Sequence, residues 1–92
     1  MAKNPVFPLY YNDFLGSTIT WTDEEVGAYI RLLIYQWDSK ELPKDYQRLT
    51  RIATSMDANW TTIKNKFTET ETGYINTNLE VIRTKQLIFK EK

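Results

Sequence analysis

Basic and amide side chains gather in the middle third of the chain, with spacings suited to recognition chemistry. Three cations recur at i, i+4 and i+7, which is one stripe of a helix: Lys44, Arg48 and Arg51. Five hydrogen-bond donors follow on the next predicted helix: Asn59, Thr62, Lys64, Asn65 and Lys66. Arginine forks bind phosphate, and Asn and Lys side chains suit base edges. We therefore expect this region to contact a nucleic acid.

Catalytic and metal-binding chemistry finds little support in the composition. The chain contains no His and no Cys, so the commonest general base and the thiolate metal ligands are absent. Glu24 and Glu25 resemble a catalytic carboxylate pair, but Glu25 stands three residues after Thr22, where a capping box places a glutamate. The three glycines build no phosphate loop. We predict no enzymatic activity, no cofactor and no metal site.

The charges are balanced overall and uneven along the chain. The formal net charge is zero, which argues against indiscriminate polyanion binding. Residues 1–39 carry two cations and five anions, whereas residues 40–68 carry six cations and three anions. An ordinary solvated helix surface gives the same counts, so charge alone does not decide between this reading and a binding surface. With no apolar run near the roughly 18 residues that span a bilayer and no signal-peptide core, we expect a cytoplasmic protein without membrane contact.

The element expected to support the basic region is a helix over residues 22–38. Thr22 and Glu25 form the predicted capping box at its start. Apolar residues then recur at helical spacing: Val26, Tyr29, Ile30, Leu33, Ile34 and Trp37. Leu32 and Tyr35 widen this stripe, so we expect a central helix covered on several sides. Gly27 lowers its helix propensity by up to about 1 kcal/mol, for which we expect a close approach by another backbone.

Three further elements are predicted downstream. Pro43 suits the first turn of a helix over 43–54. Ser55 or Asp57 is the expected N-cap of a helix over 56–67, whose apolar face is Met56, Trp60, Ile63 and Phe67. Alternating threonines and a Thr-Gly turn predict a β-hairpin over 68–77. Asn78 is the expected cap of a C-terminal helix over 78–90.

The N-terminal arm, residues 1–20, is rich in aromatic side chains. Phe7, Tyr10, Tyr11 and Phe14 stand close together, and Pro5 and Pro8 disfavour a helix here. We expect an extended segment lying across the core, because aromatic side chains bury large areas. A surface for stacking nucleic-acid bases is the alternative.

Together these elements predict one domain over residues 1–92, mainly α with a small β-hairpin. The expected fold is a winged helix-turn-helix, with a three-helix core, a hairpin wing, the N-terminal aromatic arm and the C-terminal helix. Glu69 and Glu71 at the hairpin would repel phosphates, so we do not expect the wing to grip DNA. The last helix runs off the end of the domain, which predicts that the chain is the N-terminal part of a longer protein.

Several segments together resemble one family. They are the Phe7 to Leu15 opening, the Glu-Glu-Val-Gly-Ala-Tyr helix from Thr22 to Trp37, Leu42-Pro43, Ala53 and Trp60. This set is similar to the YdaU-like family, a prophage-borne domain of unknown function. The resemblance implies a winged-helix fold in phage or prophage proteins, often at the N-terminus of replication-initiation or replisome-organiser proteins encoded near helicase loaders. The chain departs from common members in having Thr54-Ser55 where a glycine stands between helices two and three.

The leading hypothesis is therefore binding of double-stranded DNA, with helix 56–67 in the groove and the basic stripe on phosphates. Neutralising four to six phosphates predicts a slope of log affinity against log salt of roughly −4 to −5. The alternative is a protein-interaction module of replisome assembly, whose partner is a helicase loader, a replicative helicase or a second copy in a homodimer. A phage regulator is a further alternative.

Overall fold

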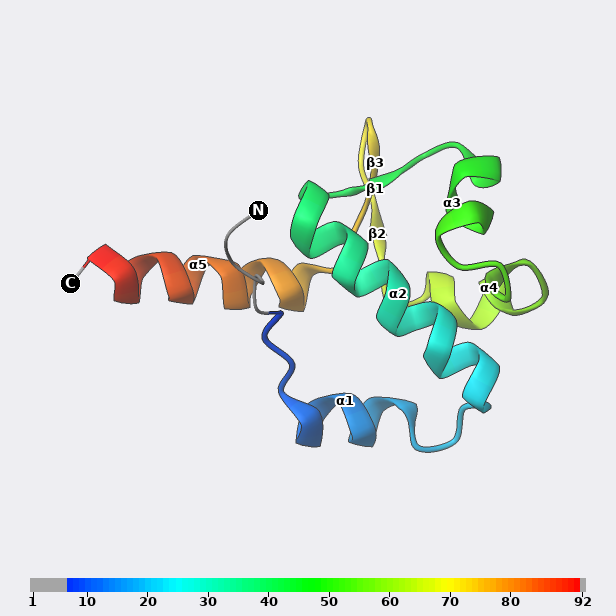
Figure 1. Cartoon of the computed structure of the whole chain (residues 1–92), viewed down its shortest axis with the longest axis horizontal. Coiled ribbons are helices and arrows are strands. Elements are labelled where there is room, and N and C mark those ends of the chain that lie inside the picture. The colour runs from blue at the N-terminus through cyan, green and yellow to red at the C-terminus, as the bar shows by residue number, and fades with distance from the viewer. Residues whose placement is uncertain (1–6, 92) are drawn as a thin grey trace, which may run out of the picture.

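A computed structural model of the chain describes residues 7–91, and the side chains of residues 7–85. Helices dominate, and a small three-stranded antiparallel sheet lies among them (Figure 1). In chain order the elements are α1 (Tyr11–Thr18), α2 (Asp23–Ser39), β1 (Leu42–Pro43), α3 (Tyr46–Ile52), α4 (Met56–Lys64), β2 (Thr68–Glu69), β3 (Gly73–Ile75) and α5 (Thr77–Glu91). The predicted class, mainly helical with a small hairpin, is confirmed. Within the described residues, no helix has the length and apolar character to cross a membrane.

Helix α2 begins at the predicted capping box. The Thr22 hydroxyl accepts a hydrogen bond from the Glu25 N–H at 3.1 Å, and the Thr22 N–H donates to Glu25 Oε1 at 2.8 Å. Two backbone donors that a helix start leaves unpaired are thereby satisfied. The helix closes at Lys40, which adopts a left-handed φ of 78° and donates its N–H to the Gln36 carbonyl.

Helix α2 buries one side only. Its buried residues are Ala28, Tyr29, Leu32, Leu33 and Gln36. On the outer side, Ile34 is 46% exposed and Tyr35 is 38% exposed. The prediction of a helix covered on several sides is therefore wrong for this outer side. The prediction for Gly27 is also wrong, because no described backbone of another element lies within 4 Å of a Cβ built there.

Leu42-Pro43 forms a strand rather than the start of a helix. In β1, Leu42 pairs with Tyr74 and Pro43 pairs with Gly73 of β3. The strand order β1-β3-β2 places β1 at an edge of the sheet. An edge strand tolerates proline, because the missing N–H can face away from the ladder.

The helix predicted over 43–54 is consequently shorter. Helix α3 begins at Tyr46, after Asp45 accepts a hydrogen bond from the Gln47 N–H at 3.0 Å. Such a carboxylate cap marks a helix start locally, and it outweighs the preference of Pro43 for a first turn. Leu49, which is buried, anchors α3 to the core.

Helix α4 packs through the predicted apolar face and ends earlier than the predicted 56–67. Met56 and Ile63 are buried, and the Trp60 ring meets the Tyr74 ring edge-on at 5.5 Å. Phe67 is also buried, although it lies beyond the helix. The chain turns at Asn65 into the sheet, so the last turn of the predicted helix is absent.

The hairpin predicted over 68–77 forms, with strands β2 and β3. Thr70 closes its turn by donating its N–H to the Gly73 carbonyl at 2.7 Å. Helix α5 then starts one residue before the predicted 78–90. Its cap is Asn76 rather than Asn78, because Asn76 Oδ1 accepts the Leu79 N–H at 3.0 Å. Beyond its first turns α5 runs away from the other elements (Figure 1).

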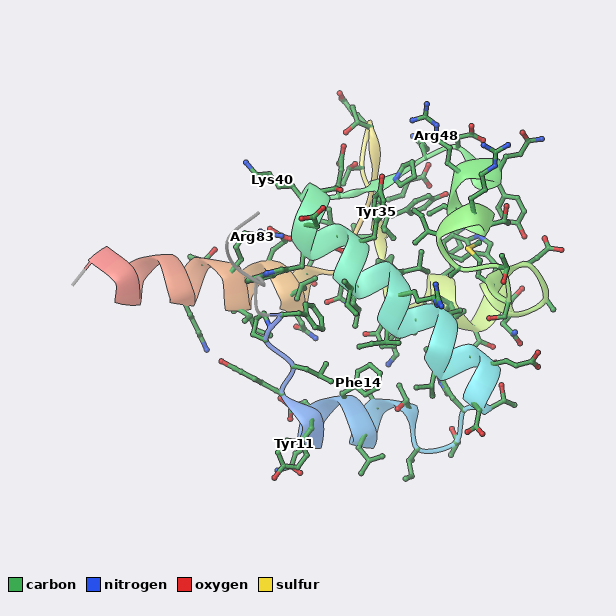
Figure 2. The ribbon with its side chains drawn as sticks, viewed as in Figure 1. Tyr11, Phe14, Tyr35, Lys40, Arg48 and Arg83 are labelled. Atoms are coloured by element: carbon green, nitrogen blue, oxygen red, sulfur yellow. The ribbon has the colours of Figure 1, made fainter. Side chains whose placement is uncertain are left out.

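The N-terminal arm contains a helix, which corrects the predicted extended segment. Pro8 precedes α1, and residues 11–18 contain no proline to prevent a helix. The Phe14 ring stacks on Tyr29 with centroids 5.5 Å apart, so the expected packing of the arm on the core holds at this residue. Tyr11 instead points away from the body and is 71% exposed (Figure 2).

Candidate nucleic-acid interface

The corner between α3 and α4 is fixed by side chains from both helices. The Tyr46 hydroxyl donates to Asp57 Oδ1 at 2.5 Å, and this carboxylate raises the pKa of Tyr46. The Ser55 hydroxyl donates to the Glu24 carbonyl at 3.3 Å, which ties the corner to the start of α2. Because Ala53 and Met56 are buried beneath it, the corner presents α3 and α4 in one orientation.

Arg48 and Arg51 are the cations that α3 carries, and both are exposed. They stand three residues apart, so they are neighbours on the helix surface. No described carboxylate forms an ion pair with either guanidinium. Arg48 projects outward from α3, away from the other helices (Figure 2).

Lys44, the third member of the predicted basic stripe, lies before α3 and contacts the hairpin instead. Its ammonium forms an ion pair with Glu69 at 3.2 Å. It also donates to the carbonyls of Thr70 at 3.2 Å and Glu71 at 3.4 Å. The i, i+4, i+7 stripe is thus reduced to two arginines, because Lys44 is not in the helix that would align it.

The side of α4 that is exposed to solvent is not the side predicted to contact DNA. Asn59 is partly buried and donates to the Ser55 carbonyl at 2.8 Å. Thr62 is partly buried near Glu25, whose pKa is lowered chiefly by the Thr22 N–H and further by the Thr62 hydroxyl. The exposed residues of α4 are Asp57, Ala58, Thr61 and Lys64. Their angular positions, at about 100° per residue, could have shown this side from the sequence.

Lys66 and Asn65 follow α4 and differ in their surroundings. The Lys66 ammonium lies 5.6 Å from the centroid of the Trp21 ring, and the Lys66 carbonyl accepts from Asn76 Nδ2 at 2.8 Å. Asn65 and Lys64 are exposed. Of the eight predicted contact residues, four therefore already have partners within the chain: Lys44, Asn59, Thr62 and Lys66. Arg48, Arg51, Lys64 and Asn65 remain exposed, and DNA contact by any of the eight stays a prediction.

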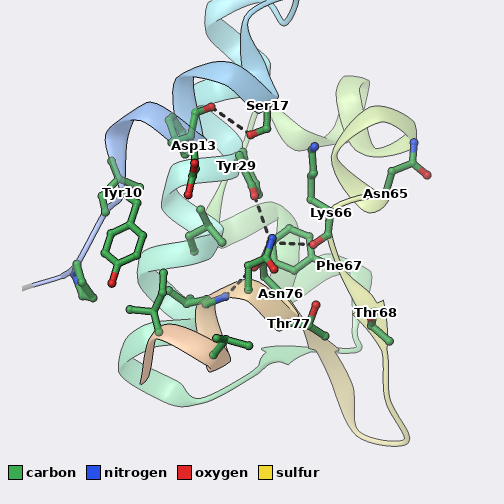
Figure 3. A pocket seen from close by; sticks show the side chains of 18 of the residues that line it. Tyr10, Asp13, Ser17, Tyr29, Asn65, Lys66, Phe67, Thr68, Asn76 and Thr77 are labelled. Atoms are coloured by element: carbon green, nitrogen blue, oxygen red, sulfur yellow. Dashed lines mark hydrogen bonds between the residues drawn. The ribbon is translucent and has the colours of Figure 1, made fainter. Parts of the chain in front are cut away.

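A pocket of about 640 Å³ lies between α1, the α4–β2 turn and α5, and two of the predicted contact residues, Asn65 and Lys66, are among those that line it (Figure 3). Tyr29 and Asn76 are its buried polar residues, and they bond to each other, with Asn76 Nδ2 donating to the Tyr29 hydroxyl at 3.2 Å. Burial raises the pKa of Tyr29. Within the described residues, no buried side-chain polar atom lacks a partner, and no three acidic side chains gather as a metal site would need.

Comparison with known proteins places the chain in a family. Residues 5–81 match the family described as "Protein of unknown function (DUF1376)". The chain belongs to this family. The match covers every element from α1 to β3 and the start of α5, so the folded body described above is the family's domain.

A relative supports the same membership. The chain is 34% identical over 70 residues to "Uncharacterized protein YdaU" of Escherichia coli (strain K12). The match covers 75% of this chain and 24% of that protein, so the chain corresponds to about a quarter of its relative's length. The resemblance to the YdaU-like family is thereby confirmed. No solved structure matches the chain.

Proposed function

We propose that this domain is a winged helix-turn-helix that binds double-stranded DNA through α3 and α4. The carrying observation is that Arg48, Arg51 and Lys64 are exposed cations on the two helices of one fixed corner, unpaired with any described carboxylate. In this proposal Arg48 and Arg51 contact phosphates, while Lys64 and Asn65 face the groove. From the family resemblance we further propose that the DNA binding serves replication initiation, by a phage or prophage protein in the bacterial cytoplasm.

The order of elements supports the winged-helix assignment. Helix α2, edge strand β1, helices α3 and α4, and the β2–β3 hairpin follow one another, with β1 joining the hairpin in one sheet. In such a fold the second helix of the corner is the recognition helix, and the hairpin is the wing. Glu69 and Glu71 make the wing acidic, so we place phosphate contacts on α3 and not on the wing.

The salt dependence of duplex binding tests this proposal. Two arginines on two phosphates predict a slope of log affinity against log salt of about −2, smaller in magnitude than the sequence alone suggested. Fluorescence anisotropy of a labelled duplex over a salt series measures it. The double variant Arg48→Gln with Arg51→Gln should bring the slope close to zero and weaken binding at every duplex sequence.

A matched control is Lys85→Gln, which removes an exposed cation from α5. This variant should bind duplex as the unaltered chain does, because Lys85 lies outside the corner. An equal loss per charge removed for Lys85→Gln and for the double arginine variant would point to general charge attraction. No binding at low salt by the unaltered chain would reject DNA binding altogether.

A protein-interaction role in replisome assembly is the second candidate, favoured by the outer side of α1. Tyr11, Leu15 and Ile19 share this side, and Leu15 and Ile19 are 57% and 69% exposed. Exposed apolar side chains of this kind mark contact sites for other proteins. If a helicase loader or replicative helicase is the partner, Leu15→Asp should abolish its capture, whereas Asn12→Asp on the same helix should not.

A further inference from the structure

The outer side of α2 carries an apolar groove that no described element fills. The groove has a volume of about 510 Å³, and Ile34 and Tyr35 of α2 line it. Phe7 and Ile52 contribute from the arm and from α3. Large apolar side chains left exposed together on a helix indicate a site for another chain.

Two opposite charges flank these apolar residues on the same helix. Arg31 precedes Ile34 by three residues, Asp38 follows it by four, and both charged residues line the groove. Neither forms an ion pair with another described residue. They are seven residues apart, which is two helical turns or about 10 Å along the axis.

The spacing of Arg31 and Asp38 allows two copies of α2 to pair their charges with each other. When two copies of α2 lie antiparallel about a twofold axis between Ile34 and Tyr35, residues 31 and 38 face each other across the axis. Arg31 of each copy then meets Asp38 of the other, and the apolar residues of both copies meet at the centre. An interface in which one patch serves both partners is the usual arrangement of homodimers.

We propose that a second copy of this chain occupies the groove, forming a twofold dimer through antiparallel α2 helices. A contact made mainly by one helix from each side belongs to the small, transient class of interfaces, so we expect a Kd of about 10–100 µM. The dimer does not depend on DNA binding, and its experiment contains no DNA.

Sedimentation velocity of the full chain over a concentration series, with single charge reversals, tests the dimer. Arg31→Asp places two carboxylates opposite each other, and Asp38→Arg places two guanidiniums opposite each other, so each variant alone should dimerise at least about tenfold more weakly. Mixed in equal amounts, the two variants restore both Arg–Asp contacts and should form a one-to-one heterodimer. The combined variant Arg31→Asp with Asp38→Arg should dimerise like the unaltered chain.

Asp13→Arg is the control, because it makes the same charge change as Asp38→Arg at an exposed position on α1. It should leave the dimer unchanged, and circular dichroism checks that every variant keeps its helices. A chain that stays monomeric at millimolar concentration would overturn the proposal. So would a dimer that both charge reversals leave intact, or a mixture of the two variants that does not associate.

Discussion

Gln36 and Asn76 lie side by side in the core and exchange two hydrogen bonds. The Asn76 N–H donates to Gln36 Oε1 at 2.7 Å, and Gln36 Nε2 donates to the Asn76 carbonyl at 3.2 Å. Both residues are buried, so these bonds join the last turn of α2 to the start of α5 away from water. Asn76 also bonds to Tyr29 and to the Lys66 carbonyl, and so links three segments that are distant in sequence.

Replacing Asn76 by Ala should destabilise the domain by about 2–4 kcal/mol. The change removes the cap of α5 and leaves the Tyr29 hydroxyl and the Lys66 carbonyl without this partner in the core. Asn78→Ala is the matched control: Asn78 is exposed, so its loss should change stability by less than about 0.5 kcal/mol. Urea unfolding followed by circular dichroism measures both. Equal effects would show that Asn76 is not the linking residue.

The capping box should contribute to the free energy of unfolding at neutral pH and lose this contribution in acid. The Thr22 N–H lowers the pKa of Glu25 in the folded chain below its ordinary 4.5. Because the pKa of Glu25 is lower in the folded chain than in the unfolded chain, its carboxylate stabilises the fold fully at pH values above the unfolded pKa. This stabilisation is lost as pH falls through the folded pKa. The stability difference between the unaltered chain and Glu25→Ala should therefore shrink below about pH 4.5. Urea unfolding from pH 7 to pH 3 tests this, and a constant difference would contradict it.

Two glycines should respond oppositely to alanine. Gly27 lies within α2 with open space at its Cβ position, so Gly27→Ala should stabilise the domain by about 0.4–1 kcal/mol through helix propensity and a less flexible unfolded chain. At Gly73 a Cβ would lie 1.9 Å from the Leu42 carbonyl oxygen, a backbone atom of the paired strand. Gly73→Ala should destabilise by at least about 1–3 kcal/mol, because β1 and β3 must separate. Thermal unfolding measures both variants, and the midpoint temperature should rise for Gly27→Ala and fall for Gly73→Ala.

Glu69 should weaken DNA binding by occupying Lys44. Glu69→Gln removes the carboxylate paired with Lys44 at 3.2 Å, so the ammonium becomes available to a phosphate. If the proposed DNA binding holds, the salt slope should steepen by about one and affinity should rise. Glu71→Gln removes an exposed carboxylate from the same hairpin without releasing Lys44, and its slope should not change. Identical slopes for both variants would show that Lys44 does not reach DNA.

Features set by near neighbours in sequence were predictable. The capping box joins Thr22 and Glu25, three residues apart, and the periodic apolar residues Met56, Trp60 and Ile63 identified the buried face of α4. Such features depend on helix geometry alone, which repeats every 3.6 residues whatever the rest of the chain does. The β2–β3 hairpin was predicted for the same reason, since its strands are joined by a short turn.

Candidate site residues were predicted less well, because type and spacing do not reveal partners. Lys44 reads as one more cation before Arg48 and Arg51, yet its contacts are 25–27 residues away in the hairpin. Asn59 reads as a groove contact and instead bonds within its own helix. The sequence thus located the corner between α3 and α4. The structure showed that fewer of the predicted contact residues are free of partners within the chain than their types and spacing suggested.

By itself the sequence determined that the chain is mainly helical, where α2 starts, and which face of α4 is buried. Only the tertiary structure decided that Leu42-Pro43 is a strand, since its partner Gly73-Tyr74 lies about thirty residues away. It likewise decided that Asn76 rather than Asn78 caps α5, because Gln36, forty residues earlier, holds the backbone of Asn76 in the core. Either asparagine suits a helix start locally. The choice between them depends on a buried polar pair that exists only once α2 and α5 have met.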